Sequence, residues 1–261
     1  MSLFKSTFSA IMLSLLAVST GGTASLAGDV TVMTSGGYTA ALPLIAADFE
    51  KQTGYHLNVI VGPSMGTDPT AIPARLARGE KADAVFMVGY ALGDLIKNGA
   101  VKADSRIDMA NSSIGMVVRA GEPKPDIHDL ASFKAALLAA KSIAYSDSAS
   151  GVYISREMFK ILGLEAELAP KSHRIVAVPV ASVVAKGEAE IGFQQVSELL
   201  AIKGVDFVGK IPDGAQKVTL YSAGVPVNAE HPEGAKALFD YLATDKAIAM
   251  VAATGLDPIK H

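Results

Sequence analysis

The sequence contains no cysteine among its 261 residues, which excludes disulfides, thiol catalysis and thiolate metal sites. Its five histidines are isolated and form no His-x-x-x-His pair, so they do not predict a metal-centred enzyme. Aromatic residues make up only 6% of a chain that is 50% hydrophobic, and this composition indicates an aliphatic α/β core. No low-complexity tract and no repeat of fixed period is present.

Charged residues are also few. They account for 19% of the chain and give a net charge of −3 at pH 7. The basic residues form no block, which argues against nucleic acid or an anionic membrane surface as a partner. The chain is long enough for one large domain or two small ones.

The first 27 residues have the pattern of a cleaved signal peptide. Lys5 supplies the positive region, residues 8–18 the apolar region, and Ser25-Leu26-Ala27 a small-x-small cleavage site. The apolar run is shorter than the ~18–20 residues that span a membrane, and the site offers no cysteine for a lipid. We therefore expect a periplasmic protein that begins near Gly28, with 234 residues and, without Lys5, a net charge of about −4.

The stretch 30–54 predicts a strand, a glycine-bearing turn and a helix. Residues 30–32 are a β-branched run that suits a buried strand, and Ser35-Gly36-Gly37 follows as the turn. Apolar residues then recur from Leu42 to Phe49 at helical spacing, and Gly54 stands where a helix-ending glycine belongs. Free N–H groups at such a helix start can bind an anion, although the serine-glycine segment could equally be only a turn.

A second copy of this unit follows about a hundred residues later. Residues 143–145 form a strand and 146–151 a turn of small residues. The next helix places Ile154, Met158, Ile161 and Leu162 on one face and stops at Gly163. Strands and helices alternate elsewhere too, which predicts α/β sheets that are mostly parallel. Further strands are expected at 56–61, 84–88, 114–118, 175–178, 189–194, 205–208 and 218–225.

This arrangement resembles the two-lobed periplasmic solute-binding proteins of ABC importers, and in particular their molybdate-binding branch. The resemblance rests on serines after the first two strands (Ser35, Ser64), on an Ala-Asp pair before the third strand (Ala82, Asp83), and on a C-terminal pattern at 235–242. It spans essentially the whole mature chain. It implies a type II periplasmic binding protein fold with residues 28–112 plus 219–261 in lobe one, 113–218 in lobe two, and a ligand between the lobes.

The resemblance also implies a ligand site, no catalytic residues, no cofactor and no metal cation. The family's contacts fall on Ser35 with Gly36, on Ser64, on Ser150 with Gly151, on Ala177 and on Gln195. Ser150, however, could be only a helix N-cap. The implied partners are a small anion and the membrane permease of an ABC importer, with no nucleic acid, and the receptor itself is expected to be a monomer and not an enzyme.

Two departures from the molybdate branch leave the ligand open. Gln195 stands where that branch has a tyrosine, so an amide with donors and an acceptor replaces one hydroxyl. The loop after Ser64 is longer by residues 67–70. A molybdate or tungstate oxyanion is the first hypothesis. A small organic carboxylate is the alternative, for which Arg75 or Arg156 could supply a bidentate contact.

A further reading is a secreted serine hydrolase, since residues 62–66 match Gly-x-Ser-x-Gly around Ser64. The motif follows only two predicted strands, and the candidate histidines His173 and His231 have no supporting pattern. A signalling sensor with the same fold is the remaining alternative.

Overall fold

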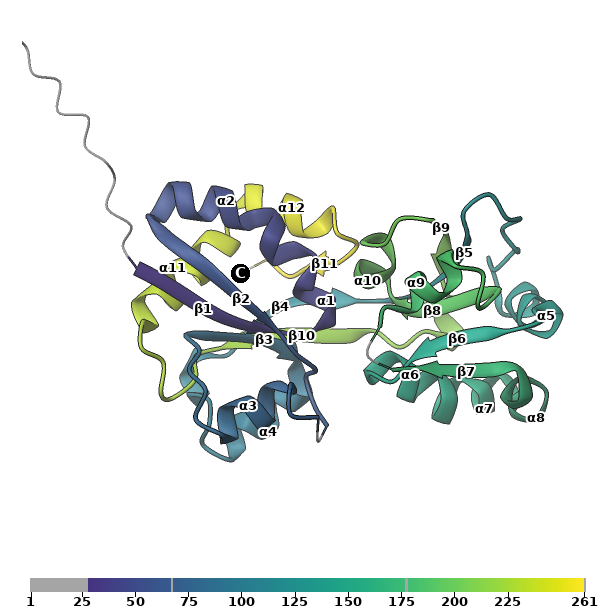
Figure 1. The fold of residues 1–261 in the computed structure, drawn as a ribbon, viewed down its shortest axis with the longest axis horizontal. Coiled ribbons are helices and arrows are strands. Elements are labelled where there is room, and N and C mark those ends of the chain that lie inside the picture. The colour runs from purple at the N-terminus through teal and green to yellow at the C-terminus, as the bar shows by residue number, and fades with distance from the viewer. Residues whose placement is uncertain (1–27, 67, 177, 261) are drawn as a thin grey trace, which may run out of the picture.

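The structure, a computed structural model, describes residues 28–66, 68–176 and 178–260. Their strands form two sheets, one toward each end of the molecule (Figure 1). We call each sheet with its helices a lobe. The predicted signal segment 1–27 lies outside the described residues. Within the described part, no helix is both long enough and apolar enough to cross a membrane.

The first lobe contains a six-stranded sheet in the order β11-β4-β10-β3-β1-β2. Its strands are β1 (Gly28–Thr34), β2 (Tyr55–Val61), β3 (Ala84–Val88), β4 (Ile107–Ser112), β10 (Thr219–Gly224) and β11 (Asp257–Pro258). β1, β2 and β3 are parallel, whereas β10, β4 and β11 pair antiparallel. The carboxyl ends of three parallel strands therefore meet at one edge of this sheet.

Helices cover both faces of the first sheet (Figure 1). One face carries α2 (Ala41–Thr53), α11 (Pro232–Leu242) and α12 (Asp245–Ala252); the other carries α3 (Ile72–Ala77) and α4 (Gly89–Lys97). Strand β3 is buried along its whole length because its side chains alternate between the two layers. Phe86 packs in the cluster under α2 and α11, and Met87 in the cluster under α3 and α4.

The second lobe contains a five-stranded sheet in the order β7-β6-β8-β5-β9. Its strands are β5 (Ile114–Arg119), β6 (Ile143–Ser146), β7 (Ser172–Ile175), β8 (Ile191–Gln195) and β9 (Val205–Lys210). One apolar cluster joins this sheet to α5 (Leu130–Ala139), to α6 (Ala149–Tyr153) and to α7 (Phe159–Leu162) and α8 (Glu165–Leu168). A second cluster joins it to α9 (Val180–Ala185) and α10 (Val196–Leu200).

The first predicted unit is confirmed, with one refinement. Its helix is divided into α1 (Gly36–Thr39) and α2, and Gly54 ends α2 in the left-handed conformation, φ 76°. Asp83, which precedes β3, is buried and accepts the backbone N–H groups of Thr31 at 2.8 Å, Glu230 at 3.0 Å and His231 at 2.6 Å. It thereby ties β1 to the start of α11.

Three details differ from the sequence-based expectation. Each sheet is mixed rather than mostly parallel, because β5 and β10, which carry the chain between lobes, pair antiparallel. The strand expected at 175–178 is β7, at Ser172–Ile175. The apolar spacing predicts Ile161 on the buried face, but its side chain is 58% exposed. A π-helical turn at Ile154–Met158 widens the helix locally, so that Phe159 is buried instead.

The chain passes between the lobes twice. The outward crossing is short, from the end of β4 through Ser113 into β5. The return crossing runs from residue 211 to 218. Gln216 joins them, because its Oε1 accepts from the Ile114 N–H at 2.8 Å and its Nε2 donates to the Ile114 carbonyl at 2.9 Å.

Candidate functional site

A pair of buried serines marks the edge where the parallel strands of the first lobe end. Ser35 follows β1, and Ser64 follows β2. The Ser64 hydroxyl donates to Ser35 Oγ at 2.6 Å and accepts from the backbone N–H of Val88, at the end of β3, at 2.9 Å. The ends of three adjacent strands are thus connected by hydroxyls, at the position where open α/β sheets bind ligands.

Tyr221 on β10 extends this network. Its Oη accepts from the Gly37 N–H at 3.2 Å and is hydrogen-bonded to the Ser35 side chain. Tyr221 is buried, and burial together with the neighbouring Glu198 carboxylate raises the pKa of its hydroxyl. Nothing in the sequence singles out Tyr221, because a tyrosine in an apolar strand is an ordinary core residue.

Glu198, in the first turn of α10, reaches the same place from the second lobe. A Cβ added to Gly36 would lie 1.9 Å from Glu198 Oε1, and one added to Gly37 would lie 2.4 Å from the Tyr221 ring. Gly37 therefore has no room for a side chain beside the buried Tyr221 ring, whereas a side chain at Gly36 would displace the end of the Glu198 side chain. Glu198 is partly exposed, yet burial raises the pKa of its carboxyl from 4.5 to about 7.

Three serines stand at the end of β6 in the second lobe, and we call them the three-serine cluster. The Ser146 hydroxyl lies 2.7 Å from that of Ser148 and 3.1 Å from that of Ser150. Ser148 is the N-cap of α6, so Ser150 lies inside the helix and the N-cap reading of Ser150 is wrong. A Cβ on Gly151 would lie 1.5 Å from the Ser146 carbonyl oxygen.

The remaining predicted site residues, Gln195 and Ala177, belong to neither group of serines. Gln195 is buried, and its amide bridges the hydroxyls of Ser112 at 2.8 Å, the last residue of β4, and Thr219 at 3.2 Å, the first residue of β10. Its neighbour Gln194 accepts from the Val180 N–H at 2.9 Å and hydrogen-bonds Glu198. Ala177 lies outside the described residues.

The two lobes meet where these groups stand, which we call the interlobe junction. Ser197 on α10 donates its hydroxyl hydrogen to the Gly37 carbonyl at 2.9 Å. Ala149, beside the three-serine cluster, packs against the apolar cluster of the first lobe. Figure 1 shows α10 next to α1 between the sheets. These contacts bring α10 and the start of α6 against the first lobe, and Glu198 approaches Gly36 beside Ser35.

Neither arginine considered from the sequence is an obvious anion contact. Arg75 donates from Nε to the Thr70 carbonyl at 3.0 Å and from Nη1 to Glu80 at 2.7 Å. Arg156 is exposed in the π-helical turn. Across the residues that the structure describes, no group of three or more His, Asp or Glu side chains is placed to hold a metal ion.

The serine hydrolase reading gains no support from the geometry. The Ser64 hydroxyl is engaged with Ser35 and with the Val88 amide. His173 lies in β7 of the other lobe, and His231 precedes α11 beside Glu233. Neither histidine is placed to activate Ser64.

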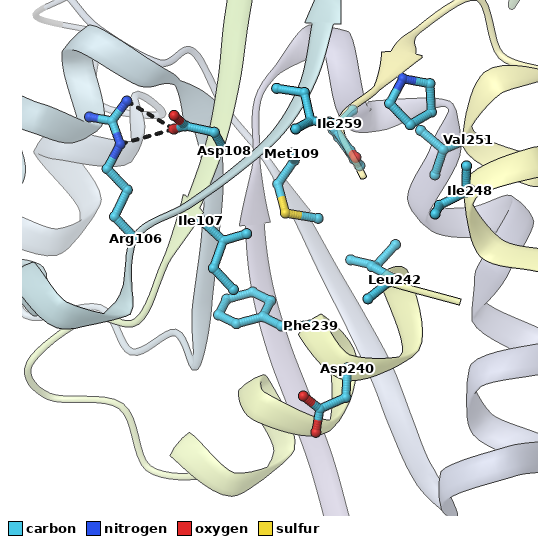
Figure 2. A pocket seen from close by; sticks show the side chains of 13 residues that line it. Arg106, Ile107, Asp108, Met109, Phe239, Asp240, Leu242, Ile248, Val251 and Ile259 are labelled. Atoms are coloured by element: carbon cyan, nitrogen blue, oxygen red, sulfur yellow. Dashed lines mark hydrogen bonds and ion pairs between the residues drawn. The ribbon is translucent and has the colours of Figure 1, made fainter. Parts of the chain in front are cut away.

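A pocket of about 520 Å³ lies in the first lobe among β4, α11 and α12, and is separate from the serines (Figure 2). Its walls are largely aliphatic and aromatic, with Ile107, Met109 and Phe239 among them. Its cation, Arg106, pairs with Asp108 at 2.9 Å. The convergent polar groups that a specific small-ligand site needs are at the interlobe junction instead.

Ser64→Ala is expected to lower the free energy of unfolding by about 1–3 kcal/mol, because it leaves the buried Val88 N–H without its acceptor. Urea unfolding measures the change. Ser182→Ala is the control, since among the described residues that hydroxyl bonds to the Pro179 carbonyl of its own helical turn, and a shift within ~0.5 kcal/mol is expected. Equal unfolding midpoints for the two variants would contradict the serine network.

The comparisons with known proteins agree with this architecture. The model of the family "Bacterial extracellular solute-binding protein" matches residues 30–257, so this chain belongs to that family. The Azotobacter vinelandii periplasmic molybdate-binding protein has a TM-score of 0.71 at 20% identity, covering 87% of this chain and 98% of that one. PEB3 of Campylobacter jejuni, with bound L-phospholactate, has a TM-score of 0.67 at 16% identity, covering 88% and 99%. These structures confirm the predicted type II binding protein fold.

A relative of much higher identity carries a different description. An aconitate isomerase from a Pseudomonas species is 50% identical over 230 residues, which is 88% of each chain. This relative is named for a reaction, whereas the resemblance found in the sequence implied binding alone.

Proposed function

We propose that this chain binds aconitate at the interlobe junction and interconverts its cis and trans isomers. The observation that carries the proposal is the 50% identity to the Pseudomonas aconitate isomerase over 88% of both chains. The Azotobacter vinelandii molybdate-binding protein is only 20% identical to this chain. The small organic carboxylate, kept as an alternative from the sequence, thus becomes the first choice.

The chemistry of the ligand fits the groups at the junction. Aconitate carries three carboxylates around one carbon–carbon double bond, so it presents acceptors in several directions. The serine pair and the three-serine cluster offer hydroxyl donors from both lobes. Isomerisation by an allylic route needs a proton removed from the methylene carbon and one supplied to the far alkene carbon, and no redox cofactor takes part.

We place the protein in the periplasm, in accordance with the extracellular description of its family and with the signal-peptide pattern of residues 1–27. We also propose lobe boundaries at 28–112 plus 219–261 and at 113–218. These divisions are supported by the membership of the strands in the two sheets.

A second candidate function is a receptor that captures a small anion for the permease of an ABC importer. The family description favours it, and molybdate or tungstate is its oxyanion version. The two candidates share one binding site but differ in whether the bound molecule is changed.

Incubation with trans-aconitate, followed by proton NMR, tests the first proposal. We expect cis-aconitate to accumulate until the equilibrium ratio is reached, and the same ratio to be approached from the cis side. Aconitate at 100 times its dissociation constant should also stabilise the fold by ~2.7 kcal/mol and raise Tm by several degrees. Tm shifts with molybdate but not with aconitate, and no interconversion, would favour the receptor.

A further inference from the structure

Glu198 is the acidic group at the interlobe junction that the hydroxyl network leaves out. Its carboxylate accepts hydrogen bonds from the Gln194 side chain and from the Gln195 backbone. The second bond is a helix-capping contact, since Gln195 is the N-cap of α10 and a glutamate three residues on commonly reaches back. Capping accounts for a glutamate at this position, but not for its approach to Gly36 of the other lobe.

The surroundings of Glu198 are mostly neutral. The hydroxyl of Tyr221 on β10 interacts electrostatically with the Glu198 carboxylate, and Tyr90 on α4 interacts with Tyr221. Helix α1 contributes the buried Tyr38. The charged side chains on β5 and β9 have partners elsewhere: Arg119 pairs with Glu122, Asp206 accepts from the Gly121 N–H, and Lys210 pairs with Asp257. On α9, Lys186 is exposed at the helix end. The carboxylate is therefore held by the Gln194 amide and the Gln195 N–H, which are uncharged.

Resting on the proposed isomerisation, we propose that Glu198 is the catalytic acid–base group that moves the allylic proton of aconitate. One of its oxygens takes the proton from the methylene carbon, so a C–H bond breaks and an O–H bond forms. The electron pair spreads over three carbons that are conjugated with carboxylates. The carboxyl then protonates the far carbon, the double bond shifts by one position, and the carboxylate is regenerated.

The placement suits both halves of this transfer. Glu198 lies at Gly36, next to Ser35, and interacts with Tyr221, which is hydrogen-bonded to Ser35, so a ligand whose carboxylate is anchored at the serine pair would place its carbon chain near this group. An acid whose pKa lies near the working pH can accept and return a proton with comparable ease, and burial brings the pKa of Glu198 to about 7. Tyr221, through Ser35, connects this group to the serine pair.

Glu198→Gln tests the assignment, because the amide retains the size and the acceptor oxygen but cannot take a proton from carbon. We expect turnover of aconitate to fall by ~10²–10⁴-fold, while the Tm shift produced by aconitate is retained. Glu233→Gln is the matched control, since Glu233 stands in the first turn of α11 but is exposed; its turnover should equal that of the wild type. Glu198→Asp should recover part of the lost rate.

Two further readouts separate the role of Glu198 from a structural one. The kcat/KM of the wild type should rise with pH through about 7, as the carboxyl loses its proton, and the residual rate of Glu198→Gln should lack this rise. In D2O, the wild type should exchange deuterium into the carbon-bound positions of aconitate, and Glu198→Gln should not.

The outcomes distinguish this inference from the proposed function. Turnover by Glu198→Gln within about threefold of the wild type would overturn the role of Glu198 and leave the isomerase intact. Deuterium exchange by the wild type that needs Glu198, without net interconversion, would overturn the isomerase and keep the role of Glu198. A wild type that shows neither exchange nor interconversion would overturn both.

Discussion

Gly151→Ala is expected to lower the free energy of unfolding by ~3 kcal/mol or more and to abolish ligand binding. The added Cβ would lie 1.5 Å from the Ser146 carbonyl oxygen and 2.6 Å from its carbonyl carbon. Both are backbone atoms of β6, so no side-chain rotation relieves the overlap, and overpacking of this kind typically costs ~1–3 kcal/mol even where neighbours can yield. The helix α6 must instead move away from the strand, and the three-serine cluster moves with it.

Gly93→Ala is the matched control for this substitution. Gly93 lies inside α4, and its added Cβ would meet only Arg106 Nη1, at 3.7 Å. Because alanine favours helix over glycine by ~1 kcal/mol, this variant should be as stable as the wild type or more so. Chemical denaturation of both variants, with isothermal titration of aconitate, makes the comparison. Equal free energies of unfolding for Gly151→Ala and Gly93→Ala would show that α6 does not need its close contact with β6.

Glu198→Gln is expected to stabilise the fold above pH 7 and to leave it nearly unchanged below pH 4.5. The carboxyl has a pKa of 4.5 as its ordinary value and about 7 in the fold, so the native state holds the proton more tightly than the unfolded state does. The stabilising contribution of the protonated Glu198 carboxyl is therefore fully present below pH 4.5, and it is lost as the pH rises through 7. The shift corresponds to ~3 kcal/mol as an upper figure, and solvent around a partly exposed group reduces it.

Urea unfolding of the wild type and the variant between pH 4.5 and 8.5 measures this effect. The difference between the two free energies should grow across the window from 4.5 to 7 and then level off. Glu233→Gln, at an exposed position, should show no such trend. Parallel curves for wild type and Glu198→Gln would mean that the Glu198 carboxyl is not perturbed by the fold.

The sequence was sufficient for the elements whose signals are local. The run 30–54 carries a β-branched strand, a helical apolar spacing and a terminal glycine, and β1, α2 and Gly54 match it. The sequence also predicts the turns that carry Ser35 and Ser64, because each comes after a strand. The hydrogen bond between the two hydroxyls follows from the parallel arrangement of those strands.

The rest depends on contacts between distant segments. Tyr221 and Glu198 carry no local signal, because a tyrosine in an apolar strand and a glutamate in a first helical turn are both ordinary. Only the packing of β10 and α10 against α1 brings them to Gly36 and Gly37. Ile161 was misplaced because a π-helical turn has no simple signature in the apolar spacing. The resemblance predicts Gln195 as a ligand contact, whereas in the structure its amide is hydrogen-bonded to Ser112 at the end of β4 and to Thr219 at the start of β10.

The glutamines at the crossings restrict how the lobes can move. Gln216 joins the return crossing to Ile114 on the outward one, and Gln195 bridges Ser112 and Thr219. Because Gln216 and Gln195 each join the outward chain segment to the return segment, neither segment can bend alone. The lobes are left with rotation about one shared axis as their easiest motion, because twisting or sliding would break these side-chain amide hydrogen bonds. Such a rotation would keep α10 and α1 in one alignment, so the side chains of Gln195 and Gln216 would fix the relative orientation of the two lobes.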